Sequence, residues 1–147
     1  MTHWINTVSR DHVSRGVAGG FAQANHGKPD PLRRLARGDL IAFYSPKTDY
    51  PEGDPLQAFT ALGRVLDDEP YQVEVSPDFQ PYRRNVEFLD CVETPIRPLL
   101  GSLDFIEDKK RWGFRFRFGL FRIDEHDFEV IRAAMTSELA GGGAAVA

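Results

Sequence analysis

The sequence has little of the residue chemistry on which metal sites and disulfide frameworks depend. Among 147 residues there is one cysteine, Cys91, so the chain cannot form an internal disulfide or a thiolate zinc cluster. This composition predicts a reduced, cytoplasmic protein. No pair of its four histidines has the i,i+3 or i,i+4 spacing on a common helix that is typical of metal ligands: His3, His12, His26 and His126. We therefore expect no metal and no cofactor.

Catalytic motifs and long apolar runs are also missing. The chain has no G-x-S-x-G, no P-loop, no G-x-G-x-x-G and no H-E-x-x-H. Cys91 lies in the apolar run 86–92, which does not favour a thiolate nucleophile. No apolar window approaches the roughly 20 residues that cross a bilayer, and the first residues do not resemble a signal peptide. We expect a non-catalytic protein without a membrane partner, with a monomer favoured.

Charge is distributed unevenly along a chain whose formal net charge is -4. Residues 1–47 hold seven Lys/Arg against three Asp/Glu, and residues 109–147 hold seven against five. Residues 48–108 hold only four Lys/Arg against fourteen Asp/Glu. If the two basic ends meet in the fold, one face of an acidic protein can attract a polyanion.

Strand-like runs separated by short helices and irregular loops dominate the local patterns. Strands are predicted at 3–8, 39–45, 57–66, 71–75, 85–92 and 111–123, and helices at 9–16, 30–37 and from Asp124 to about Met135. Without βαβ repeats, this order predicts an α+β protein: a small curved sheet or barrel of five to six strands with flanking short helices. We expect one domain over residues 1–135 and a disordered tail over 136–147.

The stretch RWGFRFRFGLFRI, residues 111–123, alternates arginine and aromatic residues with a period of two. As a strand it places Arg115 and Arg117 on one face and five apolar side chains on the other: Trp112, Phe114, Phe116, Phe118 and Leu120. One interpretation is an exposed platform on which bases stack. The alternative, favoured because so large an apolar patch is costly on a monomer, buries the aromatic face and leaves the arginines in solvent.

The glycine-rich loop 19–28 is a stronger candidate for binding. Its glycines let backbone donors approach a ligand, Phe21 offers a π-face, and Gln23 carries a donor and an acceptor suited to a base edge. The alternative is a connector whose Phe21 packs into the core. We expect Ser45-Pro46-Lys47 to line the same site. Arg83 and Arg84 either bind phosphate or pair with the local acidic excess.

Several short motifs follow one another in a fixed order between residues 3 and 135. They are W-I (4–5), S-R-D-H (9–12), G-V-x-G-G-F-x-Q-x-x-H-G-K (16–28), G-D-x-I-x-F-Y-S-P-K (38–47), G-R-V (63–65), F-x-P-Y-R-R-N-V (79–86), W-G-F-R-F-R-x-G (112–119) and D-F-x-x-I-x-x-A-M (127–135). Together they resemble the stand-alone bacterial EVE-domain proteins over nearly the whole chain.

The resemblance implies a PUA-like fold, a small β-barrel with helices around it, related to YTH domains and thymocyte nuclear protein. Members of the EVE family are regarded as readers of modified bases, particularly modified cytosines in DNA. They hold a flipped base near the end of the first strand and the loop after the first helix. YTH domains enclose their base with tryptophans, and Phe21 stands where one of these would fall, so their preference for methylated adenine is not transferred.

Placed on this chain, the resemblance and the residue chemistry together give two sets of candidate residues. The first would bind the base: Asn6, Ser9, Phe21, Gln23, Ser45 and Pro46. The second would hold the nucleic-acid backbone: Lys28, Lys47, Arg83, Arg84, Arg115 and Arg117.

The leading hypothesis is therefore non-catalytic binding of a modified nucleobase, with modified cytosine favoured, in DNA or RNA. The partner is a nucleic acid that carries such a base. Two alternatives stay open, because nothing in the sequence names a catalytic base or a nucleophile: an enzyme that acts on a nucleoside-like ligand, or a small-molecule sensor that uses the same cleft.

Overall fold

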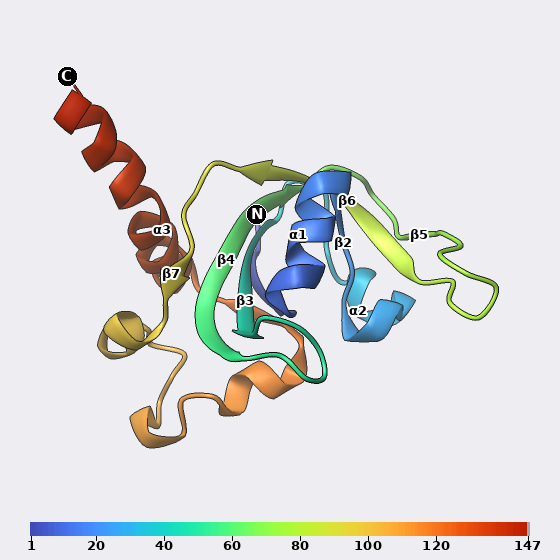
Figure 1. Cartoon of the computed structure of the whole chain (residues 1–147), viewed down its shortest axis with the longest axis horizontal. Helices are drawn as coiled ribbons and strands as arrows, with labels where there is room; N and C mark the ends of the chain where they lie inside the picture. The colour runs from blue at the N-terminus through green and yellow to red at the C-terminus, as the bar shows by residue number, and fades with distance from the viewer. Residues whose placement is uncertain (147) are drawn as a thin grey trace.

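The computed structural model describes the backbone of residues 1–146 and the side chains of residues 1–137. Within this part, one curved eight-stranded sheet forms the body of the molecule, in the order β2-β6-β4-β3-β1-β8, with β5 paired to β6 and β7 to β4 (Figure 1). The strands are β1 (His3–Thr7), β2 (Phe21–Ala22), β3 (Leu40–Lys47), β4 (Pro55–Val65), β5 (Tyr71–Gln72), β6 (Tyr82–Leu89), β7 (Thr94–Pro95) and β8 (Leu120–Ile123). The predicted α+β class and curved sheet are confirmed.

Short helices flank this sheet, as expected. The α-helices are α1 (Arg10–Gly19), α2 (Pro29–Leu32) and α3 (Glu125–Val146); the 3-10 helices are η1 (Asn25–Gly27), η2 (Arg97–Ser102), η3 (Lys109–Arg111) and η4 (Phe114–Phe118). Helix α3 extends beyond Met135, where we expected it to end. The side chains of residues 138–147 lie outside the described part, and the disordered tail over 136–147 stays a prediction. No described helix has the length and apolar character needed to cross a membrane.

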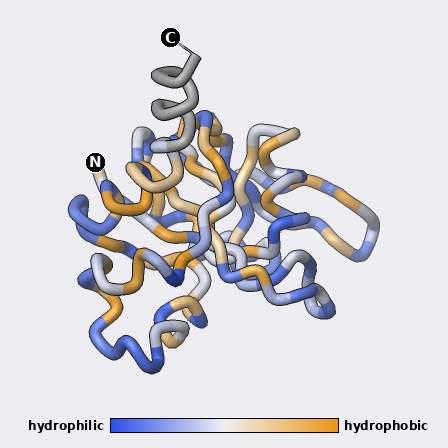
Figure 2. The backbone as a smooth tube through the Cα atoms, turned by 60° about the vertical axis from the view of Figure 1, so that its left-hand side comes forward, coloured by the Kyte–Doolittle hydropathy of each residue, from blue (hydrophilic) through white to orange (hydrophobic). Residues whose placement is uncertain are grey.

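Both faces of the central strands are buried, because helices cover each side. On β3, Ile41 and Phe43 pack into one apolar core beneath α1 and α2, while Ala42 and Tyr44 pack into a second core with α3. Polar, blue stretches lie mainly along the outer loops in Figure 2, and orange stretches run through the interior. Burial of both faces explains why the sequence of this strand is apolar at successive positions rather than at alternate ones.

The strand order brings the ends of three strands, β1, β3 and β8, together at one end of the sheet. Strands β1 and β3 are parallel, from the pair His3 and Leu40 to the pair Thr7 and Tyr44. Strand β8 runs antiparallel to β1, and Thr7 N donates to Gly119 O at 2.9 Å just before β8 begins. The carboxyl ends of β1 and β3 therefore meet the start of β8 and the start of α1.

The predicted strand over 111–123 is wrong for most of its length. Only Leu120–Ile123 forms a strand; η3, η4 and turns occupy the rest. In a helical turn, residues two apart no longer share a face, so the aromatic side chains separate. Phe116 is buried, with 6% of its surface exposed, whereas Phe114 and Phe118 are 54% and 56% exposed. The expectation that the whole aromatic face lies in the core is thus wrong for two of its rings.

Candidate functional site

A pocket of about 460 Å³ opens at the end of the sheet where these strand ends meet. Its walls come from the end of β1 and the first turns of α1, the loop 23–27 after β2, the end of β3 with the loop that follows, and the η4–β8 connection. Its volume lies within the range of small-molecule sites. It is the natural candidate for ligand binding because four separate elements converge on it.

Thr7 and His12 line this pocket, and each carries one polar atom that the fold leaves unpaired. Thr7 Oγ1 and His12 Nε2 are buried atoms without a hydrogen-bond partner among the described residues. Ser9 also lines the pocket; it is the N-cap residue of α1, but its hydroxyl makes no capping hydrogen bond. Buried polar groups are nearly always paired in folded proteins, so unpaired atoms beside a cavity indicate a place for a polar ligand.

The surroundings of His12 favour the neutral form of its imidazole. Burial lowers its pKa from the ordinary 6.5, and the nearby charges of Arg15, Arg83 and His26 lower it further. Arg15 Nη2 lies 3.5 Å from His12 Nδ1, and because a guanidinium only donates, this long contact favours Nδ1 as the acceptor. In that tautomer Nε2 carries the proton. His12 thus offers the pocket an N–H donor.

A chain of contacts beneath the loop holds Gln23 in place. Asn6 Nδ2 donates to the Gln23 carbonyl at 2.8 Å, and Arg83 Nε donates to Gln23 Oε1 at 2.7 Å. The Arg83 guanidinium lies 3.7 Å from the centre of the Phe21 ring and covers its face. Phe21 is 9% exposed, and Asn6 Oδ1 is buried without a partner among the described residues. Of these four residues, only Gln23 lines the pocket.

The loop on the other side of Gln23 is tightly fixed rather than a flexible connector. Asn25 and His26 adopt positive φ angles of 47° and 60°, which is uncommon for residues other than glycine. Gly119 faces them with a φ of 72°, and a Cβ at this position would lie 2.1 Å from Asn25 Oδ1. Glycine is strongly favoured at residue 119, because its backbone angle strains other residues and a Cβ would also force the Asn25 side chain to move.

Aromatic rings and positive charge complete the pocket. Tyr50 is 67% exposed and its ring centre lies 5.1 Å from that of His26. Phe116 forms part of the wall, where its ring stacks on Tyr44 with centroids 4.1 Å apart. Three cationic residues line the pocket, against a single carboxylate from Asp49: Arg15, Lys47 and Arg117. The site can accept a planar, polar ligand attached to an anionic chain.

Comparison with known proteins assigns this architecture to a family. The family model described as EVE domain matches residues 2–134. The chain belongs to the EVE domain family. Relatives of this EVE domain include a UPF0310 protein of Mycolicibacterium vanbaalenii, 74% identical over 96% of this chain and 99% of that protein. UPF0310 protein YdcG of Bacillus subtilis is 40% identical over 95% of both chains.

A solved structure that is distant in sequence shares its fold. Protein PSPTO5229 of Pseudomonas syringae is 15% identical, with a TM-score of 0.58 over 89% of this chain and 97% of that one. Human THYN1, solved in complex with 5-methylcytosine-containing DNA, is 14% identical, with a TM-score of 0.49 over 88% of this chain and 94% of that one.

The structure places the predicted base-binding residues of this EVE domain in two groups. Ser9, Gln23 and Pro46 line the pocket. Asn6 and Phe21 lie behind Gln23, and Ser45 is fully buried with its hydroxyl 2.8 Å from Thr60 Oγ1. The ring of Phe21 is 9% exposed and the Arg83 guanidinium covers one of its faces, so the stacking role given to Phe21 stays a prediction.

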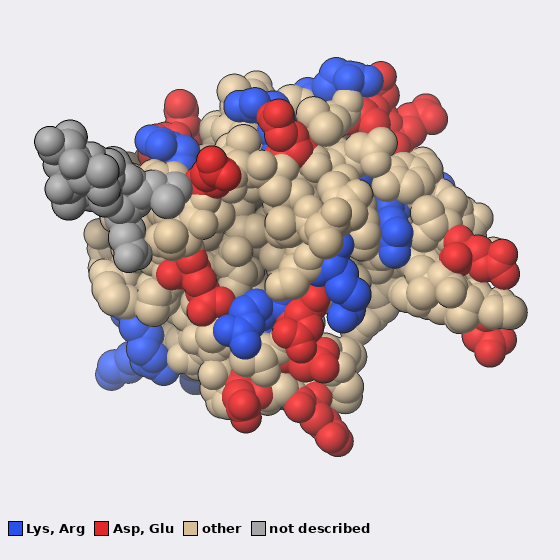
Figure 3. Space-filling model, turned by 45° about the horizontal axis from the view of Figure 1, so that its top comes forward, with Lys and Arg blue, Asp and Glu red and all other residues tan. Residues whose placement is uncertain are grey.

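The predicted backbone-binding residues are also divided. Lys47 and Arg117 line the pocket. Lys28 is exposed and directly follows Gly27, a lining residue. The guanidinium of Arg115 lies 5.1 Å from the centre of the Phe121 ring. Red and blue side chains are intermixed on the face drawn in Figure 3, so this face carries no patch of one sign.

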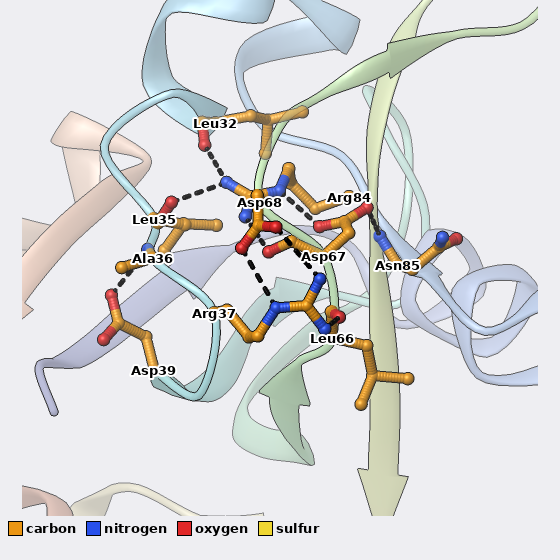
Figure 4. A network of polar contacts seen from close by, with 10 residues as sticks. All are labelled: Leu32, Leu35, Ala36, Arg37, Asp39, Leu66, Asp67, Asp68, Arg84 and Asn85. Atoms are coloured by element: carbon orange, nitrogen blue, oxygen red, sulfur yellow. Dashed lines mark hydrogen bonds and ion pairs between the residues drawn. The ribbon is translucent and has the colours of Figure 1, made fainter.

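Arg84 has a structural role in this fold. Its side chain is 0% exposed and donates to the carbonyls of Leu32 and Leu35 at 2.7 and 2.6 Å (Figure 4). It also donates to the side chain and the carbonyl of Asp67, each at 2.6 Å. Four of its five N–H groups are paired and its side chain is fully buried, so Arg84 has no free face for a phosphate.

Sequence reasoning did not single out several pocket residues, although His26 lies in the candidate loop 19–28 and Thr7 stands at the end of the first strand: Thr7, His12, Arg15, His26 and Tyr50. A local signal existed for two of them. Ser9, His12 and Arg15 follow one another at intervals of three at the start of α1, which places them on one helix face. Tyr50 gave no such signal, because its place depends on how the loop after β3 folds back.

A group of metal-ligand types lies outside the pocket. Single ligand atoms of Asp104, His126 and Asp127 lie within 4.8 Å of one another. Both Asp127 oxygens already accept backbone N–H groups, from Asp104 at 2.9 Å and Phe105 at 2.8 Å. His126 Nδ1 lies between the two carboxylates, 3.2 Å from Asp104 Oδ2 and 2.9 Å from Asp127 Oδ1. These contacts explain the cluster as a bridge between α3 and the segment before it.

Proposed function

We propose that this EVE domain binds a modified nucleobase, with modified cytosine favoured, that is flipped out of a nucleic-acid strand into the pocket between β1, β3 and α1. The observation that carries the proposal is the pair of unpaired polar atoms at the pocket, Thr7 Oγ1 and His12 Nε2. Membership of the EVE family and the cationic rim support it.

The unpaired atoms supply the energy that a flipped base requires. Leaving a buried polar group without a partner costs about 1–3 kcal/mol, which a base edge recovers when it pairs with that group. Flipping costs a few kcal/mol, so two recovered hydrogen bonds offset much of it. The Thr7 hydroxyl both donates and accepts, and the His12 N–H donates to a carbonyl oxygen or ring nitrogen of a pyrimidine.

The rim supplies the contact with the strand. Arg15, Lys47 and Arg117 line the pocket and provide cations for the phosphates on either side of the flipped nucleotide. Phosphate contacts make affinity fall as salt rises, and they do not depend on the base. Tyr50 offers an exposed ring on which the base can stack.

The test is fluorescence anisotropy with oligonucleotides of one sequence whose central cytosine is unmodified, 5-methylated or 5-hydroxymethylated, in DNA and in RNA. We expect tighter binding of a modified strand, with affinity that falls as salt rises. A His12→Gln variant should bind the modified and the unmodified cytosine strands more weakly without a change in salt slope, because the carbonyl oxygen and ring nitrogen that His12 would contact are common to both bases. Lys47→Ala should weaken all strands about equally and reduce the salt slope by about one.

Other outcomes separate the alternatives. Absence of binding to any strand at low salt contradicts the proposal. Binding of the free modified nucleoside without binding of any strand favours a small-molecule sensor. Mass spectrometry of the recovered oligonucleotide reveals an enzyme if the base has changed.

A further inference from the structure

The segment 109–123 is the most basic part of the chain. It contains six Lys/Arg and no Asp/Glu, in a protein whose net charge is -4. Five of the six lie within residues 109–117, in η3 and η4. This segment, coloured orange in Figure 1, lies beside the loop that joins β3 to β4. Its charge is opposite in sign to the net charge of the rest of the molecule, and it is suited to binding a polyanion.

Two aromatic rings stand exposed within this basic segment. Phe114 and Phe118 are 54% and 56% exposed, and their centroids lie 5.8 Å apart with the rings nearly perpendicular, at 84°. Phe116, between them, points inward and packs on Tyr44. Two large aromatic side chains that touch each other on the surface are costly unless a partner covers them.

This pair lies next to pocket residues in the chain and contacts one of them. Phe116, Arg117 and Gly119 all line the pocket, so Phe118 stands between two lining residues. The Arg117 guanidinium lies 5.6 Å from the centre of the Phe114 ring, and so connects the pocket wall to the exposed pair. A strand whose base occupies the pocket must place its neighbouring nucleotides near the rim.

We propose that Phe114 and Phe118, here named the rim pair, stack on the bases next to the flipped nucleotide. This inference rests on the proposed function and adds to it the residues that hold the flanking strand. Flipping removes a base from the stack and exposes the faces of its neighbours. Aromatic side chains cover such faces, while the lysines and arginines around them bind the phosphates.

The experiment measures the affinity of Phe114→Ala and Phe118→Ala for the modified oligonucleotide. Each variant should bind about 10-fold more weakly, which is the scale of one lost stacking contact. The slope of log affinity against log salt should not change, because no charge is removed. Val75→Ala, at a site 55% exposed on the β5–β6 hairpin, is the control and should bind as the wild type does.

A second measurement separates stacking from a general loss of contact. Replacing the bases next to the modified nucleotide by abasic sites should weaken wild-type binding about 10-fold. The same replacement should have little further effect on the double variant Phe114→Ala/Phe118→Ala, because the stacking partners are already gone. Thermal unfolding of each variant should match the wild type, since both rings are exposed.

The outcomes distinguish this inference from the proposed function. If the wild type prefers the modified strand and the rim-pair variants bind as tightly as it does, the rim pair has no such role. Additive losses from the variants and the abasic sites also overturn the stacking contact. If the wild type binds no strand, the proposed function fails and the rim pair fails with it.

Discussion

Some residues at the pocket lower the stability of the free protein and are suited to binding a ligand. Thr7 Oγ1 and His12 Nε2 are buried without partners among the described residues, which costs stability in the free protein. Gly119 contributes in a different way, since its absent side chain lets Asn25 approach. Such local costs are common at functional sites, and they point to the residues whose substitution separates stability from binding.

Replacing Thr7 by valine should have opposite effects on stability and on binding. Valine keeps the shape and removes the unpaired hydroxyl, so the free energy of unfolding should rise by about 1 kcal/mol. The modified oligonucleotide should bind about 5- to 10-fold more weakly if the hydroxyl pairs with the base. Urea unfolding and fluorescence anisotropy measure the two effects. A variant that is more stable and binds as the wild type does would remove Thr7 from the site.

Arg84 should be among the most costly residues to replace. Arg84→Ala removes four hydrogen bonds and leaves Asp67 and two buried carbonyls without their donor, at a cost of about 3–5 kcal/mol in urea unfolding. Arg84→Lys should restore little, because an ammonium cannot reproduce the planar fork of donors. Arg64→Ala, in an exposed pair with Glu87, is the control and should cost less than about 1 kcal/mol. Comparable costs at both sites would contradict the structural role of Arg84.

At the scale of the elements, the local sequence patterns predicted the sheet far better than the pocket. Strands β1, β3, β4 and β6 were predicted within a few residues, because their apolar patterns report burial on the faces of a sheet. The strand predicted over 111–123 was wrong for most of its length, because the same alternation of arginine and aromatic residues is also compatible with a helical turn in which only one ring packs inward. Which ring is buried depends on Tyr44, about seventy residues earlier, and the local pattern carries no information about it.

The contacts of Asp127 illustrate the same limit. This residue stands in the first turn of α3, and its carboxylate accepts the N–H groups of Asp104 and Phe105, more than twenty residues earlier. It thereby fixes the segment that leads to η3 and η4 onto α3. The candidate site was predicted in outline, and the residues that complete it come from loops whose paths depend on such distant contacts.

Replacing Asp127 by asparagine should therefore loosen this segment. One of its two acceptors becomes a donor that faces a backbone N–H, which should cost about 1–3 kcal/mol in urea unfolding. Hydrogen exchange should accelerate at the amides of Asp104 and Phe105. The exposed neighbour Glu125→Gln is the control and should change neither. If exchange at residues 104 and 105 is unaffected, these amides are held by something other than the carboxylate.

At the scale of the whole molecule, the fold brings the two basic ends of the chain to one place. Arg15 and Lys47 come from residues 1–47 and Arg117 from residues 109–147, and all three line the pocket. The acidic middle segment contributes Tyr50 and a single carboxylate, Asp49, to that lining. An acidic protein thus concentrates cations around one cavity, and this concentration requires the parallel pairing of β1 with β3 and the return of β8 beside β1.

The pH dependence of stability should show two histidines acting in opposite directions. Burial lowers the pKa of His12, so below about pH 6.5 the unfolded chain takes up a proton more readily than the folded chain does. The contribution of His12 to stability therefore decreases as the pH is lowered. The hydrogen bond with Asp127, helped by the charge of Asp104, raises the pKa of His126. Its contribution is therefore complete below about 6.5 and is lost as pH rises through the higher folded-state pKa.

Urea unfolding of His12→Gln and His126→Gln between pH 5 and 8.5 separates these contributions. The first variant should lose less stability than the wild type on acidification below about pH 6.5. The second should be less stable than the wild type near pH 5.5 and approach it at the alkaline end. The double variant should show the sum of both changes, because the two histidines lie in different parts of the fold, one at the pocket and one at the start of α3. If His12→Gln follows the wild-type profile, His12 is not held neutral by burial, and the N–H donor assigned to the pocket loses its basis.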